Sequence, residues 1–256
     1  MGLRAALIVG LLVAAPPVAA TEDPLRSGVF DLMHAELLGG GPYVFDDRVA
    51  VAAPAHAEDN MVVPITVDAR ALADVEEIVV FADLNPIPLV ARFRPEKAAP
   101  YLSLRLQLEQ GGPIRAAART ASGTWHVGGR FVDAAGGGCT APAEVHASSG
   151  WPAHLGEVWG RAWPEGDGVQ RVKVRTYHPM DTGLADGIPA FYVDALRVRG
   201  ADGEVLAEIR PFEPVSEHPV FTLLVEPPAG SETLRIDGRD TDANTFEGTV
   251  PLSWTM

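Results

Sequence analysis

The sequence is poor in cysteine and lysine, and it contains no block of basic residues. A single cysteine, Cys139, can form neither an internal disulfide nor a multi-cysteine metal site. Only two of the 20 basic residues are lysines, against 34 acidic residues, and the formal net charge is −14. These shortages disfavour binding to nucleic-acid phosphates and to anionic membrane surfaces.

Long apolar runs are also lacking, except at the start of the chain. Residues 1–20 combine Arg4, an apolar stretch over 5–15, a helix-breaking Pro-Pro pair and small residues before Thr21. This order is typical of a secretory signal peptide, and the stretch is too short to span a bilayer comfortably. We therefore predict a signal peptide over 1–20, with cleavage before Thr21, and a soluble protein exported to the periplasm.

Glycine and proline are abundant, with 26 and 22 residues, which favours many turns over long helices. One short helix is predicted from Phe30 to Leu38, with Ser27 as its cap and Gly39 at its end. The clearest strand is 101–109, where leucines alternate with polar residues. Further strands are expected at 61–67, 78–81, 114–120, 124–132, 171–175, 191–199, 205–210, 220–225 and 232–237.

These strands form two blocks that are separated by a segment without alternation. The pattern predicts an all-β fold of two antiparallel β-sandwich domains with a short N-terminal helix. The first domain is expected over 21–135, a glycine-rich cysteine arm and linker over 136–168, and the second domain over 169–256. One long all-β domain is the alternative. The tryptophans of the linker are expected to pack at the joint between the domains: Trp151, Trp159 and Trp163.

The lone cysteine follows three glycines, Gly136, Gly137 and Gly138. Glycine has no side chain to pack and loses much conformational freedom when it becomes ordered. We therefore predict an exposed thiol on a mobile loop, rather than the small buried hydrophobe that a free cysteine usually is. No lysine or arginine lies within eight residues of Cys139, so nothing close in sequence would lower its pKa.

The histidines show no metal-binding spacing. His146 and His154 lie near Cys139 in sequence, but no third ligand is indicated, and we expect no metal and no cofactor. The acidic residues around Asp240 are expected to form a turn rather than a calcium site. His178, Pro179 and Met180 follow a predicted strand, where a turn and simple packing are expected; a role at the interface between the domains is the alternative.

Six short motifs follow one another along the chain with a characteristic spacing. They are AEDNMVVP at 57–64, NPIP at 85–88, GGGC at 136–139, HPMDTG at 178–183, IPAFYV at 188–193 and SEHPVF at 216–221. Together they resemble SoxY followed by SoxZ, the periplasmic carrier pair of sulfur oxidation, joined in one chain. Fused chains of this kind resemble the SoxYZ-like carriers associated with quinoprotein alcohol dehydrogenase systems.

The resemblance implies two immunoglobulin-like sandwiches and a carrier that is not an enzyme. Cys139 would hold a cargo group covalently, as sulfur intermediates are held in the thiosulfate pathway, and Gly136, Gly137 and Gly138 would be the hinge of its arm. Sox-type enzymes, or a quinoprotein (PQQ) dehydrogenase with c-type cytochromes, would be the partners. In SoxY the cysteine lies almost at the chain end, whereas here the chain continues into the second domain, so the arm is tethered at both ends.

Two other functions are compatible with the residues. The chain could be a non-covalent accessory module that docks onto a periplasmic quinoprotein dehydrogenase and uses no thiol chemistry. It could also be a thiol-dependent transferase, but that reaction needs a base near Cys139, and the sequence indicates none.

Overall fold

The structure, a computed structural model, describes residues 22–253, and the predicted signal peptide lies outside them. The described chain contains 15 strands in two sheets, one α-helix and two short 3-10 helices. The predicted all-β fold with a short N-terminal helix is confirmed. Between residues 22 and 253, no helix is long and apolar enough to cross a membrane.

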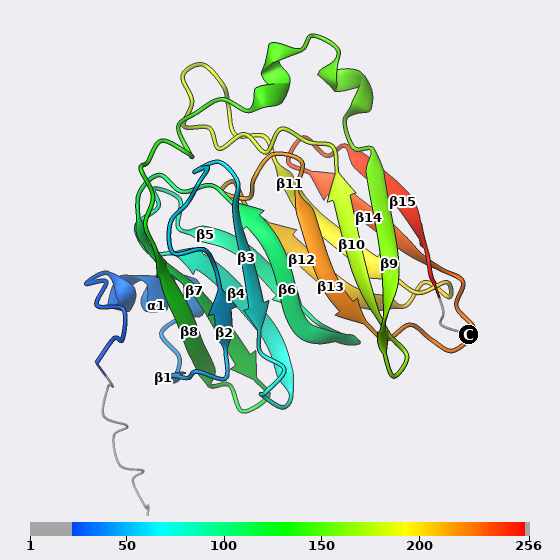
Figure 1. Cartoon of the computed structure of the whole chain (residues 1–256), viewed down its shortest axis with the longest axis horizontal. Helices are drawn as coiled ribbons and strands as arrows, with labels where there is room; N and C mark the ends of the chain where they lie inside the picture. Colours follow the sequence, from blue (N-terminus) through cyan, green and yellow to red (C-terminus); the bar gives the residue numbers. More distant parts are fainter. Residues whose placement is uncertain (1–21, 254–256) are drawn as a thin grey trace, which may run out of the picture.

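The larger sheet has nine strands, and both halves of the chain contribute to it (Figure 1). Its strands in spatial order are β1 (Tyr43–Phe45), β8 (Trp125–Val132), β7 (Gly112–Thr120), β4 (Val75–Ala82), β5 (Leu89–Arg94), β12 (Val205–Pro211), β11 (Val193–Arg199), β14 (Thr233–Asp240) and β15 (Thr245–Pro251). All neighbours pair antiparallel except β1 with β8.

The smaller sheet lies in front of it in the view of Figure 1 and has six strands. In spatial order they are β2 (Ala50–Ala52), β3 (Val63–Asp68), β6 (Ala98–Leu106), β13 (Val220–Val225), β10 (Val169–Thr176) and β9 (Val158–Gly166). The two halves are hydrogen-bonded to each other in both sheets, through β5 with β12 and through β6 with β13. The two sandwiches are therefore joined edge to edge, without a break in either layer.

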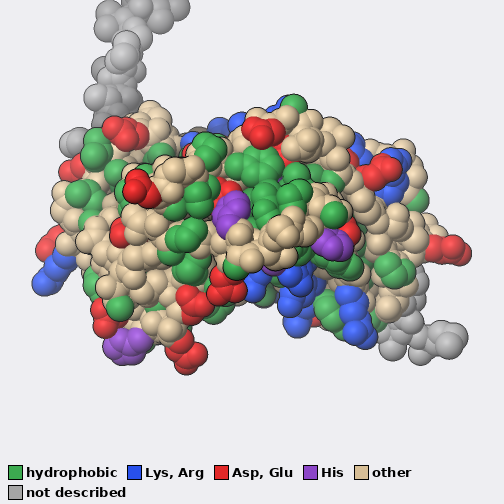
Figure 2. Space-filling model, turned by 90° about the horizontal axis from the view of Figure 1, so that it is seen from above, with side chains coloured by type: hydrophobic (Ala, Val, Ile, Leu, Met, Phe, Trp, Pro, Cys, Tyr) green, Lys and Arg blue, Asp and Glu red, His purple; other side chains and the backbone are tan. Residues whose placement is uncertain are grey.

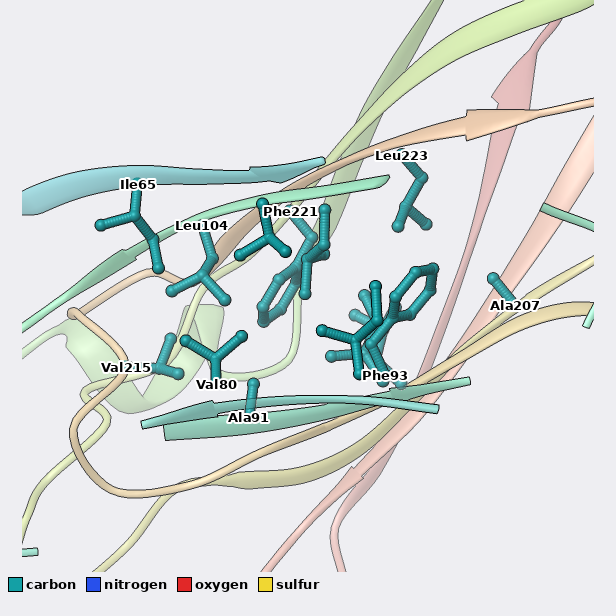
Figure 3. Close-up of a cluster of buried hydrophobic side chains, with 14 of the residues drawn as sticks. Ile65, Val80, Ala91, Phe93, Leu104, Ala207, Val215, Phe221 and Leu223 are labelled. Atoms are coloured by element: carbon teal, nitrogen blue, oxygen red, sulfur yellow. The ribbon is translucent and has the colours of Figure 1, made fainter. Parts of the chain in front are cut away.

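Side chains from both halves fill one core between the sheets. Figure 3 shows Leu104 and Phe93 from the first half close to Phe221 and Leu223 from the second. All four are at most 2% exposed. Aliphatic and phenylalanine side chains from the paired strands thus close the joint between the halves.

The prediction that tryptophans pack at this joint is wrong. Trp159 and Trp163 lie on β9 and are 45% and 36% exposed, with Ala162 buried between them. The physical reason is that β9 is a regular edge strand whose alternate residues point to solvent. Trp151 lies in the 3-10 helix η2 (Trp151–His154), so the segment expected to be irregular contains a helix and a strand.

The helix α1 (Phe30–Leu38) covers the outer face of the nine-stranded sheet. Phe30 and Met33 pack there against Phe81 and Trp125, which is why β4 is buried on both of its faces. Gly39 ends the helix in the left-handed conformation, as predicted. Ser27 does not cap the helix: Val29 stands at the N-cap position, and its backbone N–H is 3.4 Å from the Ser27 hydroxyl.

One long connection runs across the end of both sheets, from β8 to β9. It carries Cys139 and the 3-10 helices η1 (Glu144–Ala147) and η2, and it forms the green crossing at the top of Figure 1. The loop from β10 to β11 rises to the same end of the molecule. The fold therefore brings the cysteine to the boundary between the two halves.

Candidate functional site

Cys139 is buried, with 1% of its surface exposed, so the prediction of an exposed thiol is wrong. Its Sγ lies 3.6 Å from the carbonyl oxygen of Gln107, just beyond the end of β6. Backbone bonds from Gly137 to Glu109 and from Gly138 to Leu108 align the glycine segment with this strand extension. The segment is thus held against the first domain, and the thiol faces protein.

The glycines allow a close backbone approach here, and their predicted role as a hinge stays a prediction. A Cβ on Gly138 would lie 2.3 Å from the carbonyl oxygen of Asn60 and 2.6 Å from that of Leu108. No side chain fits in that space. Gly136 and Gly137 have φ angles of 105° and 84°, which side-chain-bearing residues rarely adopt.

Two polar side chains of the first domain hold the segment in place. The carboxylate of Glu109 accepts hydrogen bonds from the backbone N–H groups of Cys139 (3.1 Å) and Thr140 (3.2 Å), and from the Thr140 hydroxyl. The amide of Asn60 donates to the carbonyl oxygen of Gly136 at 2.8 Å. Apart from the bond of the Thr140 hydroxyl, these contacts are hydrogen bonds to backbone groups, which water can replace when the segment moves away.

The second domain holds the cysteine from the other side. The hydroxyl of Thr182 donates a 2.6 Å hydrogen bond to the carbonyl oxygen of Cys139. Thr182 is 7% exposed, and its neighbour Asp181 is bonded to His146 of the connection at 2.9 Å. Asp181 also pairs with Phe191 in a backbone bridge, which fixes this loop.

His178, Pro179 and Met180, singled out from the sequence, are all buried. The His178 ring packs on Phe191 with 4.4 Å between ring centroids, and its Nδ1 accepts the backbone N–H of Met180. The Met180 sulfur lies 3.3 Å from the backbone nitrogen of Val193. These three residues shape the turn that presents Thr182 to Cys139, while the thiol itself bonds to Gln107.

Burial dominates the electrostatics of the site. It raises the pKa of the Cys139 thiol to about 12, and the Glu109 carboxylate adds to this effect. It lowers the pKa of His178 to about 3, with a contribution from His218. In this closed state Cys139 is a protonated thiol at neutral pH, and protonated thiols are poor nucleophiles.

Within residues 22–253, no group of three or more His, Cys, Asp or Glu side chains could hold a metal ion. His146 is bonded to Asp181 and His154 to Glu157, rather than to the cysteine. Asp240 accepts backbone N–H groups from Asp242 and Asn244, as expected for a turn.

Four positioning residues escaped the sequence analysis: Asn60, Gln107, Glu109 and Thr182. Asn60 and Thr182 do belong to the motifs at 57–64 and 178–183, and Glu109 ends the clearest predicted strand. Nothing in their spacing indicates that they meet at the cysteine segment. The contact of Glu109 spans 30 residues of sequence and that of Asn60 spans 76, while the contact of Thr182 crosses between the domains.

Two family models match the chain in tandem. The model of sulfur oxidation protein SoxY matches residues 34–139, and that of sulphur oxidation protein SoxZ matches residues 161–251. The first match ends at Cys139.

Solved structures with similarity include the sulfur carrier protein SoxY from Chlorobium limicola f thiosulfatophilum, 24% identical, with a TM-score of 0.37. That match covers 41% of this chain and 91% of the other. A beta-glycosidase from Bacteroides vulgatus is 13% identical, with a TM-score of 0.24, over 80% of this chain and 25% of the other. No curated protein matches the chain.

Proposed function

The chain belongs to the SoxY and SoxZ families of sulfur-oxidation carrier proteins, with both domains in one polypeptide, and from this premise we propose that it carries a sulfur-containing group covalently on Cys139. The observation behind the proposal is that the SoxY match ends on the single thiol of the chain, directly after three glycines. A carrier of this kind needs one attachment point and no catalytic base.

The buried thiol makes the structure a closed state of this carrier. Loading requires that the segment 136–140 leaves Gln107, Glu109 and Thr182, because the thiol is otherwise covered and protonated. The segment is held mainly by hydrogen bonds to its backbone, so it can be released without opening the core between the sheets. Release exposes the thiol to water and lowers its pKa towards the ordinary value of a thiol.

Transfer of a sulfane sulfur illustrates the chemistry that the released thiol can perform. The Cys139 thiolate attacks the outer sulfur of a partner's persulfide, R–S–SH. A new S–S bond forms on Cys139, the S–S bond of the donor breaks, and the donor leaves as the thiolate R–S⁻. The reaction exchanges one persulfide for another, so it needs no external oxidant, and the carrier contributes only an accessible thiolate.

The proposed setting is the periplasm, in keeping with the signal-type sequence over 1–20. The proposed partners are Sox-type enzymes, or a quinoprotein (PQQ) dehydrogenase system with c-type cytochromes. Thiosulfate-derived sulfur is the proposed cargo for the Sox-type partners. The acidic net charge would favour encounter with basic partner surfaces.

Intact mass spectrometry of the protein from its native periplasm, prepared without reductant, tests the proposal. We expect an added mass on Cys139 that disappears after reduction and whose value identifies the cargo. The Cys139→Ser variant, whose thermal stability is checked in parallel, should show no such adduct. An unmodified mass from cells growing on the relevant sulfur substrate would contradict covalent carriage and favour the non-covalent docking module.

A further inference from the structure

A groove of about 660 Å³ crosses the outer face of the six-stranded sheet where the two domains meet. Its lining residues belong to, or lie next to, strands β6, β13, β10 and β9, which lie side by side in Figure 1. Met61 and Arg105 contribute from the first domain, and Trp159, Lys173 and Arg175 from the second. The groove therefore exists only in the joined protein, and Cys139 is not among its lining residues.

Four basic side chains line this groove: Arg105, Arg161, Lys173 and Arg175. Their place follows from strand register. Lys173 on β10 stands opposite Arg161 on β9, and Arg175 stands opposite Trp159. Alternate residues of β10 point to solvent, so Lys173 and Arg175 share the outer face.

Arg105 joins the same row from the first domain. Thr222 of β13 pairs with Lys173 on one side and with Ser103 of β6 on the other. Arg105 lies two residues beyond Ser103, so its side chain projects from the same face. One of its terminal amino groups donates to the carbonyl oxygen of His218 at 3.0 Å, while its Nε is buried without a partner.

None of these four side chains has a carboxylate within 4 Å in the described part of the chain. Arg171, on the same strand but outside the groove, pairs with Glu165 at 2.5 Å. Arg161 and Arg175 stack instead on the rings of Trp163 and Trp159, at 5.1 Å and 5.5 Å. Figure 2 shows Lys and Arg side chains gathered right of centre on the lower edge of its view, on the side of this sheet, with Asp and Glu side chains to their left.

These cations repel one another in the free protein. Burial and the charge of Arg175 both lower the pKa of Arg105. Burial, Arg175 and Arg105 lower the pKa of His218 to about 4, so this histidine adds no charge at neutral pH. An anion bound between the guanidinium groups would replace this repulsion by attraction.

Three carboxylates line the groove as well. Two of them, Glu144 and Glu217, lie at the end where β10 finishes. Glu217 lies just before β13, and the first residue of β13, Val220, pairs with Arg175 in the sheet. The carboxylate of Glu217 accepts the backbone N–H groups of Glu144 and Val145. Asp59 is the third. Lys173 and Arg161 pair further along the sheet, away from Glu217, so the other end of the groove is basic.

We propose that the row of four basic side chains across this groove is a binding site for a small molecule that carries a sulfonate, sulfate or carboxylate group. The planar guanidinium forks of Arg105 and Arg175 match such oxyanions, which accept paired hydrogen bonds. The volume is that of a small-molecule site, which typically spans about 300–1,000 Å³. The site goes beyond the proposed covalent carriage, because it binds a free anion without the thiol.

Titration calorimetry of the full chain with benzenesulfonate and with sulfate, at constant ionic strength, tests this site. We expect saturable binding with one equivalent per chain, and no binding of the neutral benzenesulfonamide. The double variant Lys173→Gln/Arg175→Gln should bind benzenesulfonate at least tenfold more weakly. Both positions are exposed, so the fold should tolerate the changes, and an unchanged melting temperature confirms it.

The matched control is Arg171→Gln, an exposed arginine on the same strand, which should change the affinity by less than twofold. The Cys139→Ser variant should bind as the native protein does, so this test is independent of covalent carriage. Failure of both anions to saturate the native protein would overturn the site. Equal losses in Arg171→Gln and in the double variant would also overturn it, because they would indicate general charge attraction only.

Discussion

The hydroxyl of Thr182 donates a 2.6 Å hydrogen bond to the carbonyl oxygen of Cys139, so the second domain holds the residue at which the SoxY match of the first domain ends. Both residues are buried. The backbone of Cys139 is therefore held by a contact between the domains, in addition to its bond with Glu109 within the first. Any partner that displaces the loop around Thr182 would loosen the cysteine segment.

Removing this hydroxyl should make Cys139 easier to modify. In Thr182→Val, the closed state loses a hydrogen bond worth about 1 kcal/mol, so the open state becomes roughly fivefold more populated. The rate of maleimide labelling at pH 7.5, followed by mass spectrometry, should rise by about that factor. Thr249→Val, an exposed change on β15, serves as the control and should label at the native rate. Equal rates in all three proteins would show that this contact does not restrain the segment.

The raised pKa of Cys139 predicts a loss of stability at high pH. The thiol has a pKa of about 12 in the folded protein, against an ordinary value of 9.0. Between these values the folded state binds the proton more tightly than the unfolded state, so the stabilising effect is complete below pH 9 and is lost as the pH rises towards 12. Urea unfolding at pH 8 and pH 10 should therefore show a smaller loss of free energy in Cys139→Ser than in the native protein. An identical loss in both would contradict the buried thiol.

The lowered pKa of His178 has the opposite consequence, at acid pH. Its pKa is about 3 in the folded protein, against an ordinary value of 6.5, so the unfolded chain takes up a proton first as the pH falls. Its contribution to stability is present above pH 6.5 and is lost between pH 6.5 and 3. The NMR signal of the His178 ring should stay that of a neutral imidazole from pH 8 to pH 5. A midpoint near pH 6 would show that the ring is not buried as described.

Arg115 should be essential for stability. It is 1% exposed and bonds the carboxylates of Asp83 at 2.8 Å and Asp23 at 2.7 Å. Arg115→Met leaves the buried Asp83 without its partner, which should lower the free energy of unfolding by about 3–5 kcal/mol. Urea denaturation measures this loss. In the control Arg239→Met, which breaks an exposed pair with Asp194, the change should stay below about 1 kcal/mol.

Much of the fold was predictable because one face of most strands is buried. The alternation over 101–109 and 171–175 predicted β6 and β10, and the inward leucines and valines are buried. Pro64, which has no N–H to donate, fits into β3 because β2 pairs only with residues 66–68 and leaves the position of Pro64 open on that side. A local pattern is enough to predict such a strand, because one of its faces packs in the core and the other does not, so apolar and polar residues alternate along it.

The state of Cys139 could not be predicted in the same way. The identity of the candidate residue came from a local motif, but its burial depends on Asn60, Glu109 and Thr182, which are distant in sequence. Three glycines in a row are compatible with a mobile hinge and with a close backbone approach, and only the neighbouring carbonyl groups decide between them. Strands such as β1 and β2 were missed because three residues are too few to show a period.

The pairing of β5 with β12 and of β6 with β13 has a consequence for how the two domains stay together. Since both partners belong to one polypeptide, their association is a unimolecular step whose equilibrium does not depend on protein concentration. Dilution cannot separate them. Two separate chains that met along the same strands would dissociate at low concentration. Here the cysteine segment and the Thr182 loop that holds it are made as one chain, so their ratio is one to one at any expression level.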